Sequence, residues 1–284
     1  MSAFANLIPY ISFIERCLPR EALGPIADSA GRFLSSVQYR RRNVSEKNLR
    51  YLGFENTRAL ARKTIRNWTV CLSDQMRSLW MNKRELQKMV EDRWSDNLVR
   101  SRGVILVSAH LGNYELGGSY LASCGLPVHA VIEEIPRGHT ATINRIRRRF
   151  GMGVVPYSNV TRMIDILRQG KILVLLADRD FGTGGLECKF GNGIRSIPQG
   201  PALLALRTGA AIQPAYCVLN QQGYRLYVEK PIKPNTNLSA TESIKYVTHR
   251  IANRLVRIIR SYSDQWFVFT DEWLPERSDR QIKT

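Results

Sequence analysis

Residues 103–118 read GVILVSAHLGNYELGG, an apolar run that stops at a histidine and continues into small residues and a carboxylate. The run at 104–108 has the aliphatic, β-branched composition of a buried strand, and residues 114–124 are predicted to form a helix. A strand that turns into a helix is the unit of parallel α/β sheets, in which functional groups gather at the carboxyl ends of the strands. His110 is predicted to lie at such an end.

The same alternation continues after residue 103. Further strands are predicted at 128–132, 154–157, 172–177, 211–219 and 224–229, with helices at 138–150, 160–169, 199–208 and about 240–262. Residues 1 to about 95 instead show helical spacing throughout, with a helix cap predicted around Ser45. We therefore predict a single domain over 1–284 of the α/β class. Its helical amino-terminal part covers 1–95, and a largely parallel central sheet flanked by helices covers 96–284.

The composition limits the classes of partner and site. Lys and Arg number 42 against 24 Asp and Glu, a net charge of +18, which favours anionic partners such as lipid, a nucleotide-bearing donor or an acidic carrier protein. A nucleic-acid-binding protein is not expected, because no recognition motif or basic-aromatic platform accompanies the pI of 10.1. Five cysteines without CxxC pairs argue against a zinc site or a disulfide framework.

Several catalytic motifs are missing from the sequence. It has no GxSxG elbow and no HExxH, so neither a serine hydrolase nor a metalloprotease is indicated, and no cofactor or metal is expected. The stretch GTGGLECKFGNG (182–193) is glycine-rich but lacks the GK[ST] of a phosphate loop, and we expect it to be a flexible connection.

The opening segment is apolar for about a dozen residues before it meets Glu15 and Arg16. No run approaches the ~20 apolar residues that span a bilayer, and the charge order of a signal peptide is not present. The segment can pack in the core as a first helix, or lie in a membrane interface. The positive charge favours the interface, where the lipid-facing side chains would be Phe4, Leu7, Ile8, Ile11 and Phe13.

His110 and Glu115 are candidates for a catalytic pair. On a continuous helix, five residues would place them ~140° apart. They can meet if His110 lies in the turn and Glu115 in the first helical turn, with Gly112 giving the turn its backbone freedom. A carboxylate beside an imidazole raises its basicity and fixes its tautomer, as a general base requires. The alternative is a structural histidine that caps the turn.

Residues 110–115, HLGNYE, resemble the H-x4-D/E motif of the lysophospholipid acyltransferase superfamily. They are most similar to the H-x-G-N-[YW]-[DE] form of the late acyltransferases of lipid A biosynthesis and the phosphatidylinositol mannoside acyltransferases. Other stretches resemble blocks of this family in the same order: RRRNVSEKNL (40–49), LLADRDF (175–181), GLECKFGN (185–192), IPQGPALLALRTGAAIQPAY (197–216) and DQWFVFTDEW (264–273). The chain departs from the family pattern at Lys189, Ser263 and Asp271-Glu272. The resemblance runs from about residue 30 to 275.

The resemblance implies an acyltransferase fold and transfer of an acyl group from a thioester to a hydroxyl of a membrane lipid, with His110 as general base. The donor would be acyl-CoA or an acyl carrier protein. The carboxylate partner of His110 would be Glu115, the acid of the motif itself, or Glu187, which the mannoside branch implies. A glycolipid acceptor on the cytoplasmic face of the inner membrane is expected, nearer to the mannoside branch. The alternatives are a lipid A late acyltransferase that uses acyl carrier protein, and a catalytically silent lipid-binding protein.

Candidate substrate-binding residues accompany these motifs. Asp178, Arg179 and Asp180 follow a predicted strand, and Arg179 can bind a headgroup or phosphate, or pair with the two aspartates. A basic cluster in the 138–150 helix can bind donor phosphates or anionic lipid, or be a solvated face. The aromatic residues of 264–273 are expected in the core or at a lipid-facing edge. The full set of binding candidates is Asn113, Asp178, Arg179, Asp180, Arg145, Arg148 and Arg149.

Overall fold

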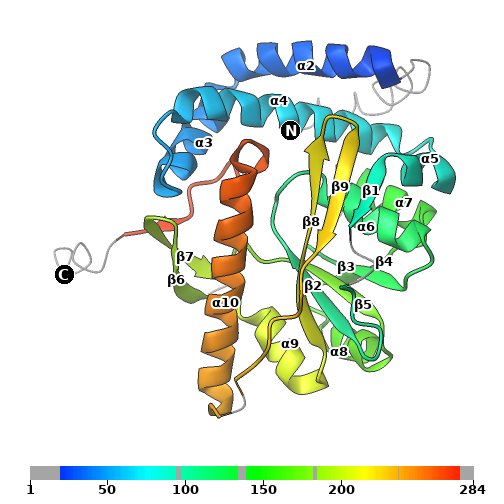
Figure 1. Cartoon of the computed structure of the whole chain (residues 1–284), viewed down its shortest axis with the longest axis vertical. Helices are drawn as coiled ribbons and strands as arrows, with labels where there is room; N and C mark the ends of the chain where they lie inside the picture. The colour runs from blue at the N-terminus through cyan, green and yellow to red at the C-terminus, as the bar shows by residue number, and fades with distance from the viewer. Residues whose placement is uncertain (1–19, 94–96, 134–138, 182–183, 236, 276–284) are drawn as a thin grey trace.

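The structure is a computed structural model that describes residues 20–93, 97–133, 139–181, 184–235 and 237–275 (Figure 1). The opening segment that was expected at a membrane interface lies outside these ranges. Within them, no helix combines the length and the apolar character needed to cross a bilayer.

Helices make up most of the amino-terminal part, as predicted: α2 (Arg20–Val37), α3 (Tyr39–Tyr51), α4 (Thr57–Arg77) and α5 (Lys83–Lys88). α2 packs along α4 (Figure 1). The prediction fails at its end, where Val90–Arg93 forms strand β1. This segment is too short and too charged for a strand pattern, and it is held at the sheet edge by parallel pairing with β9.

The central sheet has seven strands in the order β1-β9-β8-β2-β5-β3-β4. Its other strands are β2 (Val104–Ser108), β3 (Val128–Ile132), β4 (Gly153–Pro156), β5 (Ile172–Leu176), β8 (Ala211–Asn220) and β9 (Gly223–Val228). All neighbours are parallel except β8 and β9, which form an antiparallel pair. The predicted α/β class with a largely parallel sheet is confirmed.

Helices cover both faces of this sheet: α6 (Tyr114–Ser123), α7 (His139–Arg149), α8 (Val160–Arg168), α9 (Gly200–Thr208) and α10 (Ala240–Ser261). Successive side chains of β2 point to opposite faces. Ile105 belongs to the core that also contains residues of α8, α9 and α10, whereas Leu106 belongs to the core shared with α6 and α7. Burial on both faces explains the continuous apolar run VILV.

A second sheet of three antiparallel strands has the order β10-β7-β6. It consists of β6 (Leu186–Phe190), β7 (Gly193–Ile197) and β10 (Trp273–Leu274). The predicted flexible connection at 182–193 is therefore wrong where β6 forms. Cys188 and Phe190 are buried on one face of β6, a period-two pattern that the surrounding glycines obscure. Gly191, at a φ of +66°, makes the turn into β7.

Candidate active site

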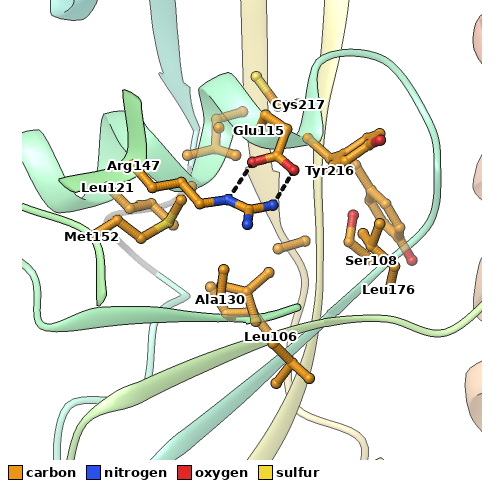
Figure 2. Close-up of a pocket in the computed structure, with 17 residues that line it drawn as sticks. Leu106, Ser108, Glu115, Leu121, Ala130, Arg147, Met152, Leu176, Tyr216 and Cys217 are labelled. Atoms are coloured by element: carbon orange, nitrogen blue, oxygen red, sulfur yellow. Dashed lines mark hydrogen bonds and ion pairs between the residues drawn. The ribbon is translucent and has the colours of Figure 1, made fainter. Parts of the chain in front are cut away.

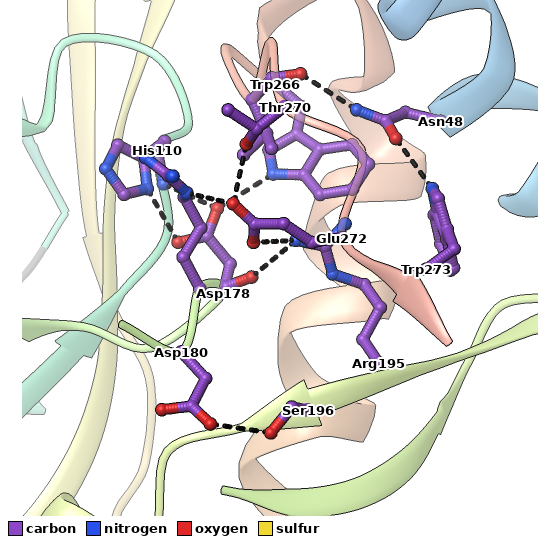
Figure 3. Close-up of polar contacts among 12 residues, drawn as sticks. Asn48, His110, Asp178, Asp180, Arg195, Ser196, Trp266, Thr270, Glu272 and Trp273 are labelled. Atoms are coloured by element: carbon purple, nitrogen blue, oxygen red, sulfur yellow. Dashed lines mark hydrogen bonds and ion pairs between the residues drawn. The ribbon is translucent and has the colours of Figure 1, made fainter. Parts of the chain in front are cut away.

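His110 and Asp178 meet at the carboxyl edge of the sheet, just after two neighbouring parallel strands. Ser108 of β2 lies in register with Leu176 of β5, and the Ala177 amide donates to the Ser108 carbonyl at 2.8 Å. The segments that follow β2 and β5 therefore leave the sheet side by side. The His110 Nδ1 lies 2.9 Å from Asp178 Oδ1, and the His110 amide donates to Asp178 Oδ2 at 3.0 Å (Figure 3).

The Asp178 carboxylate is fully buried and receives a further hydrogen bond from the Trp266 Nε1, at 2.9 Å from Oδ2. Burial by itself raises the pKa of Asp178, but the charge of His110 and the hydrogen bonds from His110 and Trp266 outweigh burial and lower it to about 2. An ionised carboxylate at Nδ1 favours the tautomer with its proton on Nδ1. The lone pair of the His110 ring is then on Nε2, where it can accept a proton.

The turn from His110 to Asn113 is fixed by its backbone. Gly112 has a φ of +59°, and a Cβ at this position would lie 2.2 Å from the Cys217 carbonyl oxygen. The Gly112 amide donates to the Gln265 carbonyl at 2.9 Å, and the Asn113 amide to the Cys217 carbonyl at 2.8 Å. Only glycine fits this turn, which confirms the expected backbone role of Gly112.

The segment Gln265–Phe267 supports the same turn from the carboxyl-terminal part of the chain. The Phe267 amide donates to the His110 carbonyl at 2.7 Å. The Gln265 side chain exchanges two hydrogen bonds, of 2.8 and 3.0 Å, with the Leu219 main chain of β8. The sequence placed the aromatic residues Trp266 and Phe267 in the core or at a lipid-facing edge, and Trp266 is buried in the core. Their direct role beside His110 was missed, because no local pattern shows which turn a distant segment contacts.

Glu115 does lie in the first turn of α6, as predicted, but it is not the partner of the His110 ring. Its carboxylate pairs with Arg147 of α7, through an Arg147 Nε–Oε2 hydrogen bond of 2.8 Å and a second bond from Nη2 to Oε1 (Figure 2). The Arg147 Nη1 also donates to Asn144 at 2.8 Å. α6 packs against α7, so this first-turn side chain meets an arginine rather than the imidazole.

Glu187 lies on β6 in the second sheet, opposite Ser196 of β7. The position beside the His110 Nδ1, which the sequence assigned to one of two glutamates, is occupied by Asp178. The sequence had named Asp178 only as a binding residue. The available signal was its position directly after the 172–177 strand, but the order of strands in the sheet was needed to use it.

These features, a histidine in an HLGNYE turn with a buried carboxylate at its ring, are accompanied by a match to a known family. Residues 4–275 match the sequence model of the bacterial lipid A biosynthesis acyltransferases. The chain belongs to this family. The resemblance deduced from the motifs is thus confirmed.

The chain is also similar to proteins with more specific names. The phosphatidylinositol mannoside acyltransferase of Mycolicibacterium smegmatis is 26% identical over 198 residues, which cover 68% of this chain and 63% of the relative. That of Mycobacterium tuberculosis (strain CDC 1551 / Oshkosh) is 25% identical over 211 residues, covering 70% and 65%. The alignments thus span less than two thirds of either relative. The crystal structure of the 1-acyl-sn-glycerophosphate acyltransferase PlsC from Thermotoga maritima aligns with a TM-score of 0.41 and 15% identity, over 87% of this chain and 99% of that one.

The remaining predicted binding residues of this family member divide into engaged and exposed groups. Asn113 is buried and acts as the N-cap of α6, accepting from the Leu116 amide at 3.2 Å, while its amide group donates to the Cys71 carbonyl at 3.1 Å. Asp180 accepts from the Ser196 hydroxyl at 2.6 Å and from the Gly185 amide at 3.0 Å. These contacts give Asn113 and Asp180 structural tasks.

The arginine candidates are more accessible. Arg179 pairs with Glu272 at 2.6 Å and stacks over the exposed Phe181 ring at 4.5 Å, so its ion pair is with Glu272 rather than with the two aspartates that follow the same strand. Arg145, Arg148 and Arg149 are exposed on α7. The expected basic face is therefore present on this helix, beside the buried Arg147.

An apolar pocket lies between the sheet and the helices α6 and α7 (Figure 2). Ser108 and Tyr114 are among its lining residues, and the Tyr114 ring meets the His110 ring edge-on with centroids 5.4 Å apart. Burial raises the pKa of Tyr114, which keeps its phenol neutral. The Glu115–Arg147 ion pair also lines the pocket. The other lining residues are mainly aliphatic or sulfur-containing, among them Leu106, Leu121, Ala130, Val131, Met152, Val174, Leu176 and Cys217.

Proposed function

We propose that this chain transfers a fatty acyl group from a thioester donor to a hydroxyl of a glycolipid, with His110 as the general base. The observation that carries the proposal is the His110–Asp178 pair beside an apolar pocket. Nε2 takes the hydroxyl proton as the oxygen attacks the thioester carbonyl. The C–O bond forms, the C–S bond breaks, and the imidazolium returns its proton to the leaving thiolate. Asp178 stabilises the imidazolium during this sequence.

Two features support a lipid substrate. The aliphatic lining of the pocket suits a hydrocarbon chain. The relatives are named for phosphatidylinositol mannosides, so a glycolipid is the acceptor we propose.

Both candidate donors are anionic: acyl-CoA carries phosphates, and acyl carrier protein is acidic. The exposed arginines of α7 would attract either donor.

We place this reaction at the cytoplasmic surface of the inner membrane. The side chains of Ile26, Phe33 and Val37 on α2 are 53%, 67% and 52% exposed, and their spacing of seven and four residues puts them on one helix face. The net charge of +18 adds attraction to anionic lipid. Apolar burial and charge together support a protein that binds the membrane interface without spanning it.

The direct test is transfer by the purified protein from acyl-CoA and from acyl carrier protein to glycolipids in mixed micelles, followed by mass spectrometry. His110→Ala should lower the rate by about 10²-fold or more, because the hydroxyl then has no base. His249→Ala, at an exposed position of α10, is the matched control and should keep the full rate. Near-normal transfer by folded His110→Ala protein would remove His110 from the mechanism.

A further inference from the structure

Trp266 holds the Asp178 side chain. Its indole N–H donates to Oδ2, the same oxygen that accepts the His110 amide. The ring is buried and packs against Phe190 with centroids 5.9 Å apart. The Arg195 guanidinium lies 5.4 Å from the centroid of the same ring. The direction of the N–H is therefore fixed by packing on more than one side.

Arg195 holds the main chain of the same residue. Its buried guanidinium donates from Nη2 to the Asp178 carbonyl at 3.1 Å and to Glu272 Oε2 at 2.8 Å. Glu272 also pairs with Arg179 at 2.6 Å. Asp178 is thus fixed at its carboxylate by Trp266 and at its carbonyl by Arg195.

We infer that Trp266 is a positioning residue of the His110–Asp178 pair, and that its indole N–H sets how tightly the pair binds a proton. The inference rests on the proposed role of His110 as the base. A donor to a buried carboxylate stabilises its ionised form. When that donor is removed, the negative charge is less satisfied, and the coupled pair takes up its proton at higher pH. If Trp266 only filled space, replacing it would change the stability of the fold but not the pH at which the pair takes up its proton.

The test replaces Trp266 by Phe, which keeps an aromatic ring and removes the N–H. We expect the acid limb of the kcat/KM profile to move up by about 1 pH unit, since a hydrogen bond to a charged group is lost. The titration of the His110 ring can also be followed by NMR, with its signal assigned by its absence from the spectrum of His110→Ala protein. The midpoint of this titration should also move to higher pH. Unchanged midpoints in folded Trp266→Phe protein would overturn the inference.

The structure offers a matched control in Trp273. Its Nε1 donates to Asn48 at 2.7 Å, and its ring also lies beside Arg195, with the guanidinium 5.0 Å from the ring centroid. Trp273→Phe makes the same chemical change near the same cation, but it leaves the donors of Asp178 in place. It should keep the wild-type midpoint. An equal shift in Trp273→Phe protein would contradict a specific role for Trp266.

A tryptophan analogue in which sulfur replaces the ring N–H, placed at position 266, serves if Trp266→Phe does not fold. It keeps the size of the indole and should give the same upward shift. If the wild-type protein shows no acyl transfer, only the proposed function is overturned. The NMR titration of the His110 ring still measures the effect of Trp266, because it does not depend on turnover. The two ideas can therefore fail separately.

Discussion

Two carboxylates near His110 meet different partners. Glu115, five residues along the chain, pairs with Arg147 in the wall of the apolar pocket, while Asp178, 68 residues away, reaches the imidazole. The first pair joins two helices, and the second joins the ends of two strands. The difference teaches that closeness in a motif does not decide which acid faces the imidazole. The order of strands in the sheet decides it, because β2 and β5 are hydrogen-bonded neighbours.

The partners also give the two carboxylates different chemistry. Arg147 stays charged at any working pH, so its guanidinium always balances the negative charge of Glu115. Asp178 instead faces a group whose charge changes when a proton arrives. Only the second arrangement can stabilise the imidazolium that the proposed mechanism forms and then discharges.

The largest expected effect comes from Asp178→Asn. The amide keeps the size of the side chain but removes the charge that stabilises the imidazolium, so we expect transfer to fall by about 10³-fold. The rate at saturating donor and acceptor measures the loss. A decrease below tenfold in protein of normal secondary structure would return the orienting role to another acid.

Glu115→Gln tests the other pair and should act on stability. It leaves the Arg147 cation, whose side chain is 10% exposed, without its counter-charge, and we expect a loss of about 3 kcal/mol in the free energy of unfolding. Urea titration measures this loss, while the transfer rate at low temperature should stay within about tenfold of the wild type.

A double variant sharpens the same result. Glu115→Gln combined with Arg147→Met removes the unpaired cation, so much of the lost stability should return. A single variant that is as stable as the wild type, or one that loses activity as strongly as Asp178→Asn, would reverse the assignment of the two carboxylates.

The pH dependence of stability should distinguish Asp178 as well. Its pKa falls from an ordinary 3.8 to about 2 in the folded protein, so its ionisation stabilises the fold above pH 4 and the contribution is lost as pH falls toward 2. At about 1.4 kcal/mol per pH unit, this amounts to about 2 kcal/mol. The difference in unfolding free energy between wild type and Asp178→Asn should shrink over this range. A difference that is constant from pH 6 to pH 2.5 would contradict it.

The smallest effect is expected at the exposed apolar face of α2, which belongs to neither carboxylate pair. Phe33→Glu places a charge in the exposed apolar face of α2 and should weaken binding to anionic vesicles several-fold. Ser36→Glu, also exposed on α2, adds the same charge without removing apolar area, and should have a smaller effect. Transfer to a soluble short-chain acceptor should remain normal in both variants. Equal vesicle binding by the wild type, Phe33→Glu and Ser36→Glu proteins would place the membrane contact elsewhere.

The sequence predicted most local elements. Strand 104–108 matches β2 at both ends, and the helix predicted from residue 114 begins there as α6. These segments carry their own signals, namely continuous apolar runs and helical spacing. Four strands were missed: β1, β6, β7 and β10. β1 and the two-residue β10 are each held by backbone pairing with a distant strand, while the β6–β7 hairpin is hidden among glycines.

The sequence by itself determined the class of the fold, the family and the position of His110 at a strand end, because each depends on residues that are close in the chain. The tertiary structure decided which groups surround the imidazole. Asp178 and Trp266 are separated by 88 residues, yet their side chains share a hydrogen bond. Such contacts follow from strand order and from the return of the carboxyl-terminal segment across the sheet edge. They are set by long-range backbone pairing and burial, for which no short stretch of sequence carries a signal.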